Sequence, residues 1–484
     1  MTAASEGDPR EAELPPDPDI AAPDTAPGEQ QDVPEREVTA LTEPRDGLPP
    51  VTATAAELAE AVRRLEAGTG PVAVDAERAS GYRYGQRAYL VQLRREGAGT
   101  LLIDPIACPD LSGVDAALAG AEAVLHAASQ DLPCLAEIGY RPRRLFDTEL
   151  AGRLLGYPRV ALGTMLEEVL GYRLAKEHSA ADWSVRPLSQ EMLTYAALDV
   201  EVLVELRDAL ARQLDEQGKT EWARQEFVAV AAAPPAPPRP DPWRRTSGIH
   251  RVRTRRGLAI VRELWTVRDQ IARDADLSPR RVLTDQAIIE AARLPGPGQP
   301  LPGQPVAGQP ATGQQAPGQP AGRPQLDKIS GFRARNAREH RARWLAAVIR
   351  ARDLPDKQLP DVTGAPAVAG PPPAHRWAER DPAAAARLAA ARDAVAELAE
   401  AHRLPAENLV APDAVRRLSW EPPSPVTPET VAAALAGYGA RPWQAGLTAE
   451  PLARAFTSAA AGYSGVADNG IGSAGDHAAS GELT

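Results

Sequence analysis

The chain has 484 residues, 43% of them hydrophobic and 25% charged, so it can bury several cores, and we expect about three domains. Its two cysteines, Cys108 and Cys134, exclude a disulfide framework and a CxxC metal site. The formal net charge of −11 argues at first against a protein that binds nucleic acid.

Residues 1–50 carry nearly all of that excess negative charge. They contain 13 acidic residues against three arginines, with many prolines and hardly any aromatic residues. Such a segment cannot bury enough apolar surface to order itself, which predicts a disordered acidic tail. It does not resemble a signal peptide, and no apolar run approaches the roughly 18 residues that span a bilayer. We therefore expect a cytoplasmic protein without membrane association.

Three acidic side chains follow two apolar runs in the next part of the chain. Asp75 and Glu77, in VAVDAE, lie two residues apart at the end of a predicted strand, so their carboxylates should share one face. Asp131 follows Ala123–His126, another predicted strand, and a short helix is expected from Gln130 to Ile138. Taken alone, acids at such positions are usually polar strand ends or helix caps.

A longer helix is predicted from Ser189 to Gln213, where apolar residues recur at helical spacing without Gly or Pro. Tyr195 and Asp199 are four residues apart and share one face of it. Four carboxylates and a phenol in one pocket would suit two divalent cations about 4 Å apart, because hard cations prefer oxygen ligands. The pattern therefore indicates a two-metal phosphodiesterase.

In chain order, VAVDAE, HAASQDLPCL and AADWSVRPLSQEMLTYAALDVEVL resemble the three exonuclease motifs of ribonuclease D, in the tyrosine branch of the DEDD superfamily. The resemblance covers residues 51–233 and implies an α/β ribonuclease H-like exonuclease domain, a mixed sheet flanked by helices. It implies that two Mg²⁺ or Mn²⁺ ions are bound and that Tyr195 orients or deprotonates the attacking water. The implied ion ligands are Asp75, Glu77, Asp131 and Asp199.

The resemblance also implies a reaction, hydrolysis of RNA from its 3′ end to nucleoside 5′-monophosphates, as in the maturation of tRNA or other structured RNA. Two positions depart from the family pattern. Arg78 follows the second acid, where many relatives have an apolar or aromatic residue, and Ala181 stands where a serine often precedes the DW pair. Lys176 and Arg186 are candidate phosphate contacts, and a solvated or capping role is the alternative for each.

A proline-rich stretch, residues 234–249, predicts a linker that ends the catalytic domain. Beyond it, residues 250–352 resemble the helical HRDC domain of ribonuclease D and RecQ-type helicases. An amphipathic helix is expected from Gly257 to Ile271, then a turn with a second helix, and a third helix over residues 329–352. A Gly-Gln-Pro repeat at residues 295–324 predicts a disordered insertion.

The HRDC-like region is strongly basic. Residues 239–293 and 323–352 together carry 22 Lys or Arg against 9 Asp or Glu. Clustered positive charge neutralises phosphates, so this surface is a candidate RNA-binding region, with Arg333, Arg335 and Arg338 as candidate contacts. A merely solvated helical surface is the alternative interpretation.

A second linker, residues 353–373, precedes another all-helical region at residues 374–458. Its segment LAAARDAVAELAEAHRLPAENLVAPDAV is similar to LWTVRDQIARDADLSPRRVLTDQAI and predicts a second HRDC-like domain. With 9 basic against 10 acidic residues it is the poorer candidate for RNA binding, and we expect it to pack on the other domains. Residues 459–484, rich in Gly, Ala and Ser, predict a disordered tail.

Three functions are compatible with these patterns. The leading one is a metal-dependent 3′-5′ exoribonuclease whose partner is an RNA 3′ end, such as that of a tRNA precursor, with no obligate protein partner. A DNA-directed 3′-5′ exonuclease in repair would use the same five residues. A noncatalytic RNA-binding protein is the third, and the complete acidic set argues against it.

Overall fold

The computed structural model describes residues 38–174, 181–235, 237–294, 326–362 and 370–468. Within these ranges, no helix combines the length and the apolar character that crossing a membrane requires. Residues 1–37 of the predicted acidic tail, Lys176 and the Gly-Gln-Pro insertion lie outside the described residues.

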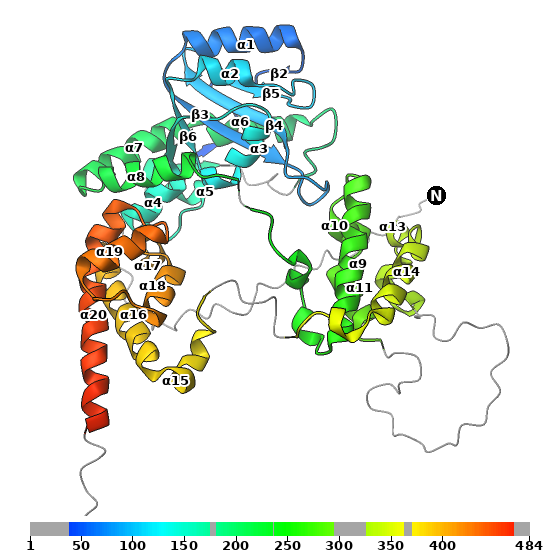
Figure 1. The fold of residues 1–484 in the computed structure, drawn as a ribbon. Coiled ribbons are helices and arrows are strands. Elements are labelled where there is room, and N and C mark those ends of the chain that lie inside the picture. The colour runs from blue at the N-terminus through cyan, green and yellow to red at the C-terminus, as the bar shows by residue number, and fades with distance from the viewer. Residues whose placement is uncertain (1–37, 175–180, 236, 295–325, 363–369, 469–484) are drawn as a thin grey trace, which may run out of the picture. The chain divides into compact units, whose positions relative to one another are not determined.

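The exonuclease domain is built on a six-stranded mixed sheet in the order β2-β5-β4-β3-β6-β7 (Figure 1). β4 runs antiparallel to both of its neighbours, and the remaining pairs are parallel. A separate parallel pair joins β1 to β8. The strands are β1 (Thr39–Leu41), β2 (Val51–Thr52), β3 (Thr69–Arg78), β4 (Ala88–Glu96), β5 (Gly99–Ile103), β6 (Glu122–Leu125), β7 (Arg144–Asp147) and β8 (Tyr172–Leu174).

Helices flank this sheet and complete the domain. α6 packs across β3, β4 and β5, whereas α4, α7 and α8 lie side by side (Figure 1), and α4 and α8 contact β7. α1 begins with a reciprocal capping box between Thr54 and Glu57. The helices are α1 (Ala55–Ala67), α2 (Ser112–Ala117), η1 (Ala128–Gln130), α3 (Leu132–Glu137), α4 (Thr148–Leu155), α5 (Leu162–Met165), η2 (Leu166–Leu170), α6 (Gln190–Glu201), α7 (Leu203–Glu216) and α8 (Thr220–Ala231).

Two predictions for this part of the chain are wrong in detail. Residues 38–50 are not part of a disordered tail, because β1 pairs with β8 in a parallel ladder. The helix expected from Ser189 to Gln213 is interrupted at Val202, whose φ of −119° and ψ of 13° separate α6 from α7. The break lies three residues beyond Asp199, so α7 can follow a different direction from α6.

The first helical domain has its own hydrophobic core. The helix expected from Gly257 to Ile271 is confirmed as α9, whereas the helix expected over residues 329–352 consists of three shorter ones. Trp243, in the predicted linker, is buried in this core, so the domain begins earlier than expected. Its helices are η3 (Pro242–Arg245), η4 (Ile249–Arg251), α9 (Arg255–Asp274), α10 (Pro279–Val282), α11 (Asp285–Ala292), η5 (Leu326–Lys328), α12 (Ser330–Arg333), α13 (Arg335–Arg338), α14 (Arg341–Asp353) and η6 (Asp356–Gln358).

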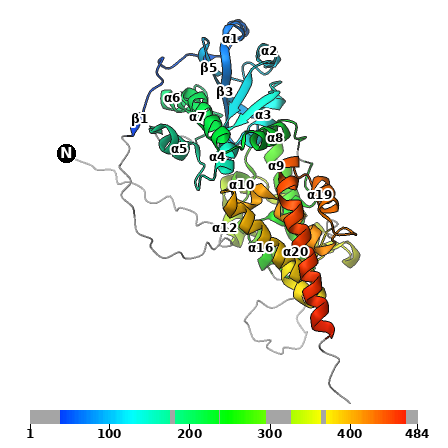
Figure 2. The ribbon, with the colours of Figure 1, turned by 90° about the vertical axis from the view of Figure 1, so that its left-hand side faces the viewer.

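The second helical domain repeats part of that arrangement. α9 and α16 have 20 residues each, and both are followed by a turn with a non-glycine residue at positive φ, Asp276 at 47° and Arg403 at 50°. Figure 2 shows α16 and α20 side by side, and α20 continues to residue 468, beyond the predicted end at 458. The helices are η7 (Ala374–Arg376), α15 (Trp377–Arg380), α16 (Pro382–Ala401), α17 (Ala406–Leu409), α18 (Pro412–Trp420), α19 (Pro428–Gly437) and α20 (Pro442–Asp468).

The second helical domain and the exonuclease domain share one continuous hydrophobic core, in line with the expectation that this domain packs on the rest. Trp222 stacks on Trp443 with ring centroids 4.8 Å apart and planes inclined by 12°. The buried Lys219 donates hydrogen bonds of 2.7 Å to the carbonyl oxygens of both Leu154 and His402. A charged donor shared by two helix ends makes this junction specific as well as apolar.

Candidate active site

Three carboxylates converge where α6 crosses β3. Asp75 and Glu77 alternate with Ala76 along β3, so both point to the face that α6 covers. Asp199 lies on the facing side of α6, and one oxygen from each of these three acids lies within 4.8 Å of the others. The pairing of a strand with a helix thus collects acids that are 124 residues apart in sequence.

Tyr195 and Asp131 complete the set that the sequence predicts. The Tyr195 hydroxyl hydrogen-bonds to the Asp199 carboxylate one helical turn away. Asp131 comes from the loop after β6, and all five residues line one cavity of about 920 Å³. Trp183 is fully buried and its ring centroid lies 6.3 Å from that of Tyr195, which restricts the position of the phenol.

Asp147 shapes the loop that carries Asp131, and sequence reasoning missed it. Its buried carboxylate caps α4 and also accepts hydrogen bonds from the N–H groups of Ala127, at 3.1 Å, and Ala128, at 2.9 Å. Ala127 has φ 59°, a left-handed conformation that costs free energy in a non-glycine residue. The Asp147 hydrogen bonds stabilise that turn and so direct Asp131 into the cavity. A single Asp before a helix shows only its capping role in the sequence.

Burial and mutual repulsion disfavour four negative charges in this cavity. Burial raises the pKa of Asp75 to about 6, and burial together with Asp75 raises the pKa of Asp131 to about 8. Burial and the three other acids raise the pKa of Glu77 to about 10, while burial and Asp75 hold the pKa of Asp199 well above its usual range. Burial, and then Asp199, also raises the pKa of the Tyr195 phenol.

This donor set fits divalent cations of the Mg²⁺ or Mn²⁺ type. All of its groups offer oxygen, which hard cations prefer, and closely spaced carboxylates lose their mutual repulsion when a cation binds between them. Asp75, Glu77 and Asp199 are the three whose oxygens are close enough to share an ion. His126, at the cavity wall, is neutral near pH 7 because burial lowers its pKa to about 4, and its Nδ1 lies 2.9 Å from Thr148 Oγ1.

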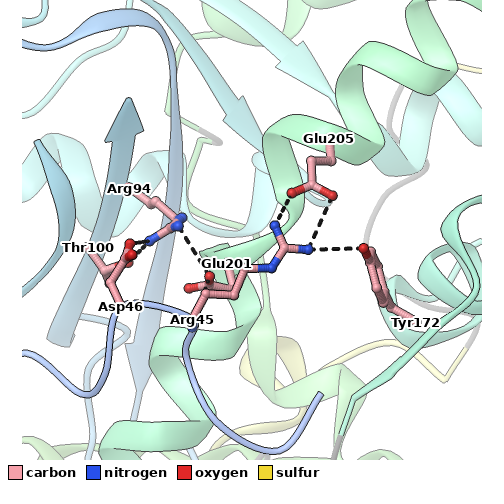
Figure 3. A network of polar contacts seen from close by, with 7 residues as sticks. All are labelled: Arg45, Asp46, Arg94, Thr100, Tyr172, Glu201 and Glu205. Atoms are coloured by element: carbon pink, nitrogen blue, oxygen red, sulfur yellow. Dashed lines mark hydrogen bonds and ion pairs between the residues drawn. The ribbon is translucent and has the colours of Figure 1, made fainter. Parts of the chain in front are cut away.

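A polar network fixes the far end of α6 (Figure 3). The buried Glu201 carboxylate lies 3.2 Å from Arg94 Nη2 and accepts a 3.2 Å hydrogen bond from the Arg45 backbone N–H. The Arg45 guanidinium pairs with Glu205 at the start of α7 and donates a 3.1 Å hydrogen bond to the Tyr172 hydroxyl of β8. Residues 38–50 therefore connect α6 to β8, whose last two residues line the cavity.

The candidate nucleic-acid contacts separate into two groups. Arg186 is internally satisfied: its five N–H groups bind Asp104 twice, at 2.6 and 2.9 Å, and the carbonyl oxygens of Trp183, Val185 and Tyr89. All of these donors are engaged within the protein, and contact of Arg186 with a phosphate stays a prediction. By contrast, Arg333, Arg335 and Arg338 are exposed on α12 and α13, at a distance in sequence from the acidic motifs.

Comparison with known proteins agrees with this fold. A family model described as a 3′-5′ exonuclease matches residues 50–215, the HRDC domain model matches residues 257–297, and a 3′ to 5′ exonuclease C-terminal domain model matches residues 370–456. The mixed sheet and these matches thus define a 3′-5′ exonuclease domain followed by helical domains. The second helical region matches a different model from the first.

Relatives in sequence and structure indicate which family of 3′-5′ exonucleases the chain is similar to. Ribonuclease D of Acidiphilium cryptum is 31% identical over 255 residues, 51% of this chain and 58% of the relative. Ribonuclease D of Escherichia coli is 30% identical over 319 residues, 63% of this chain and 74% of the relative. A protein from Bifidobacterium adolescentis of known crystal structure is 37% identical, with a TM-score of 0.74, and the match covers 87% of this chain and 100% of that one.

The chain belongs to the ribonuclease D family. The crystal structure of the Escherichia coli enzyme matches with a TM-score of 0.56 at 26% identity, covering 80% of this chain and 97% of that one. The chain spans about half the length of several curated relatives, 58%, 42% and 57% of the first three.

Proposed function

We propose that this protein is a metal-dependent 3′-5′ exoribonuclease that releases nucleoside 5′-monophosphates from RNA 3′ ends. The supporting observation is the convergence of Asp75, Glu77 and Asp199 within 4.8 Å, with Tyr195 hydrogen-bonded to Asp199 and Asp131 in the same cavity. Two divalent cations, Mg²⁺ or Mn²⁺, would lower the pKa of a water and stabilise the leaving 3′ oxygen when bound.

The residues of the chain supply the arrangement that such hydrolysis needs. Asp75, Glu77, Asp131 and Asp199 would hold the cations. Tyr195 would orient or deprotonate the attacking water. The hydrogen bond of Tyr195 to Asp199 fixes the direction of its hydroxyl.

The RNA would be held by the exposed part of the basic region. Arg333, Arg335 and Arg338 are accessible, whereas Arg256 donates to backbone carbonyls and Arg268 is buried against Asp285 at 2.6 Å. The charge available to phosphates is therefore smaller than the sequence count. The Escherichia coli relative is described as an exoribonuclease involved in structured RNA processing, which supports structured RNA, including tRNA precursors, as the substrate class.

Matched RNA and DNA oligonucleotides of one sequence test this proposal. With Mg²⁺, purified protein should shorten the RNA faster, and chromatography should identify the products as nucleoside 5′-monophosphates. Faster digestion of the DNA would favour a 3′-5′ DNA exonuclease that uses the same residues. Binding of RNA without hydrolysis, with either Mg²⁺ or Mn²⁺, would favour a noncatalytic RNA-binding protein.

A further inference from the structure

Arg78 lines the acidic cavity but has no role among the residues named above for hydrolysis. It ends β3 directly after Glu77, where strict strand alternation would turn it to the opposite face. The pairing with β4 is irregular there, because Glu77 pairs with Leu90 and Arg78 with Ala88, so one residue of β4 is skipped. The skipped residue, Tyr89, belongs to β4, and bulges of this kind are frequent next to active sites. Arg78 Nη2 lies 3.3 Å from Asp131 Oδ1.

The Arg78 side chain remains partly accessible beside its contact with Asp131. The Arg78 side chain is 26% exposed, and it lines both the acidic cavity and a second cavity of about 330 Å³. That second cavity is also bounded by Glu77 and by the loop residues Ser80, Gly81 and Tyr82. A guanidinium has five N–H donors in a planar fork that matches phosphate geometry. The contact with Asp131 leaves donors available to a ligand in either cavity.

The charge balance of the site indicates which ligand that is. Four ionised carboxylates would balance two divalent cations, so Arg78 leaves an excess of one positive charge beside them. A phosphodiester carries one negative charge and gains more during in-line hydrolysis. A fixed cation next to that position stabilises the transition state more than the ground state.

We propose that Arg78 is a further catalytic residue that binds a nonbridging oxygen of the phosphate being cleaved. This inference rests on the proposed exonuclease function and extends it to a residue at which the chain departs from its family's usual pattern. Arg78 touches a carboxylate of the cation site, so a phosphate held at that site lies within reach of its fork. The same contact with Asp131 holds the guanidinium in place before RNA arrives.

The test compares Arg78→Met, Arg78→Lys and the control Arg63→Met in the full-length protein. Arg63 pairs with Glu60 on the exposed surface of α1, so its replacement removes the same charge away from the cavity. For Arg78→Met we expect kcat on RNA to fall about 100-fold with a smaller change in KM, and Arg78→Lys to recover part of the loss, since it keeps the charge without the fork. Arg63→Met should match the unmodified protein.

Two further measurements distinguish this contact from a structural role. Mn²⁺ titrated into RNA-free protein should bind Arg78→Met at least as tightly as the unmodified protein, because Asp131 loses a competing cation. The second measurement uses RNA whose last linkage is a phosphorothioate of defined stereochemistry. For one of the two diastereomers, Arg78→Met should lower kcat little further, because the sulfur atom has already weakened the contact between Arg78 and that nonbridging position.

Weaker Mn²⁺ binding by Arg78→Met would overturn the proposal and make Arg78 a support for a metal ligand. An unchanged kcat, or equal additional losses with both diastereomers, would overturn it as well. Failure of the unmodified protein to hydrolyse RNA would instead refute the exonuclease function itself, and this inference with it.

Discussion

Replacing Asp131 by Asn should stabilise the protein in the absence of metal while it removes hydrolysis. Burial and the neighbouring Asp75 raise the pKa of Asp131 to about 8. An aspartate in an unfolded chain titrates near pH 4, so the folded state binds this proton more tightly than the unfolded state does. The free energy of unfolding therefore falls as the pH rises from about 4 towards 8.

The size of the effect follows from these two pKa values. At pH 7 the Asp131 carboxyl is still mostly protonated in the folded protein. In the unfolded chain it is ionised, because pH 7 lies about three units above its pKa there, and each unit corresponds to about 1.4 kcal/mol. Relative to a side chain that cannot ionise, the penalty is at most about 4 kcal/mol at pH 7 and about 1–2 kcal/mol at pH 5. Because a buried amide also needs hydrogen-bond partners, we expect Asp131→Asn to gain about 1–3 kcal/mol at pH 7–8.

Urea unfolding with EDTA at pH 5 and pH 8 measures this difference. The free energy of unfolding of Asp131→Asn should exceed that of the unmodified protein at both pH values, and the difference should be larger at pH 8 than at pH 5. Asp413→Asn is the control of opposite sign, since hydrogen bonds from Arg417 and Arg416 lower the pKa of Asp413. Added Mg²⁺ should stabilise the unmodified protein and affect Asp131→Asn much less. If Asp131→Asn were less stable than the unmodified protein in EDTA at pH 8, the reasoning would be refuted. The ion pair of Asp131 with Arg78 would then stabilise the folded state by more than the burial of the carboxylate destabilises it.

Three further variants test other parts of the structure. Arg45→Met should lower kcat several-fold in a steady-state assay, because Arg45 connects α6 to β8 (Figure 3). A deletion of residues 1–37 should leave kcat unchanged. Equal effects of the substitution and the deletion on kcat would contradict this role of Arg45. Lys219→Met should cost about 2–4 kcal/mol in urea unfolding, because two carbonyl oxygens lose a charged donor, and a loss below 1 kcal/mol would not fit. Replacing Arg333, Arg335 and Arg338 together by Gln should reduce the salt dependence of RNA binding. The slope of the logarithm of the binding constant against the logarithm of the salt concentration should fall in magnitude by about 2–3. An unchanged slope would show that these arginines have no role in RNA binding.

The acidic site could be predicted from the sequence because its geometry is local. A DxE pair on a strand and a Tyr–Asp pair at i and i+4 each fix one face of one element. The family resemblance then brings the three elements together, and the structure does place Asp75, Glu77, Asp131, Tyr195 and Asp199 around one cavity.

What the sequence could not show depends on contacts between distant segments. The pairing of β1 with β8, and of Arg45 with Glu201, joins segments more than 120 residues apart. The pairing of Arg186 with Asp104 likewise joins residues that are 82 positions apart. Arg78 pairs with Asp131 although strand periodicity places Arg78 on the opposite face, next to an irregularity in the pairing of β3 with β4.

The charge of the chain illustrates the same limit. A count of arginines predicts a basic surface, but the fold uses part of that charge internally, as with Arg256 and Arg268. Only accessibility shows which arginines can meet a phosphate, and Arg333, Arg335 and Arg338 are among the exposed ones.

A time course on RNA labelled at its 5′ end tests the central claim most directly, with Mg²⁺ present, EDTA added midway, and Asp199→Asn in parallel. The acidic site predicts products that shorten one nucleotide at a time from the 3′ end, an immediate stop on addition of EDTA, and no shortening by folded Asp199→Asn. Continued shortening in EDTA, or by Asp199→Asn at the rate of the unmodified protein, would contradict the assignment of hydrolysis to these carboxylates.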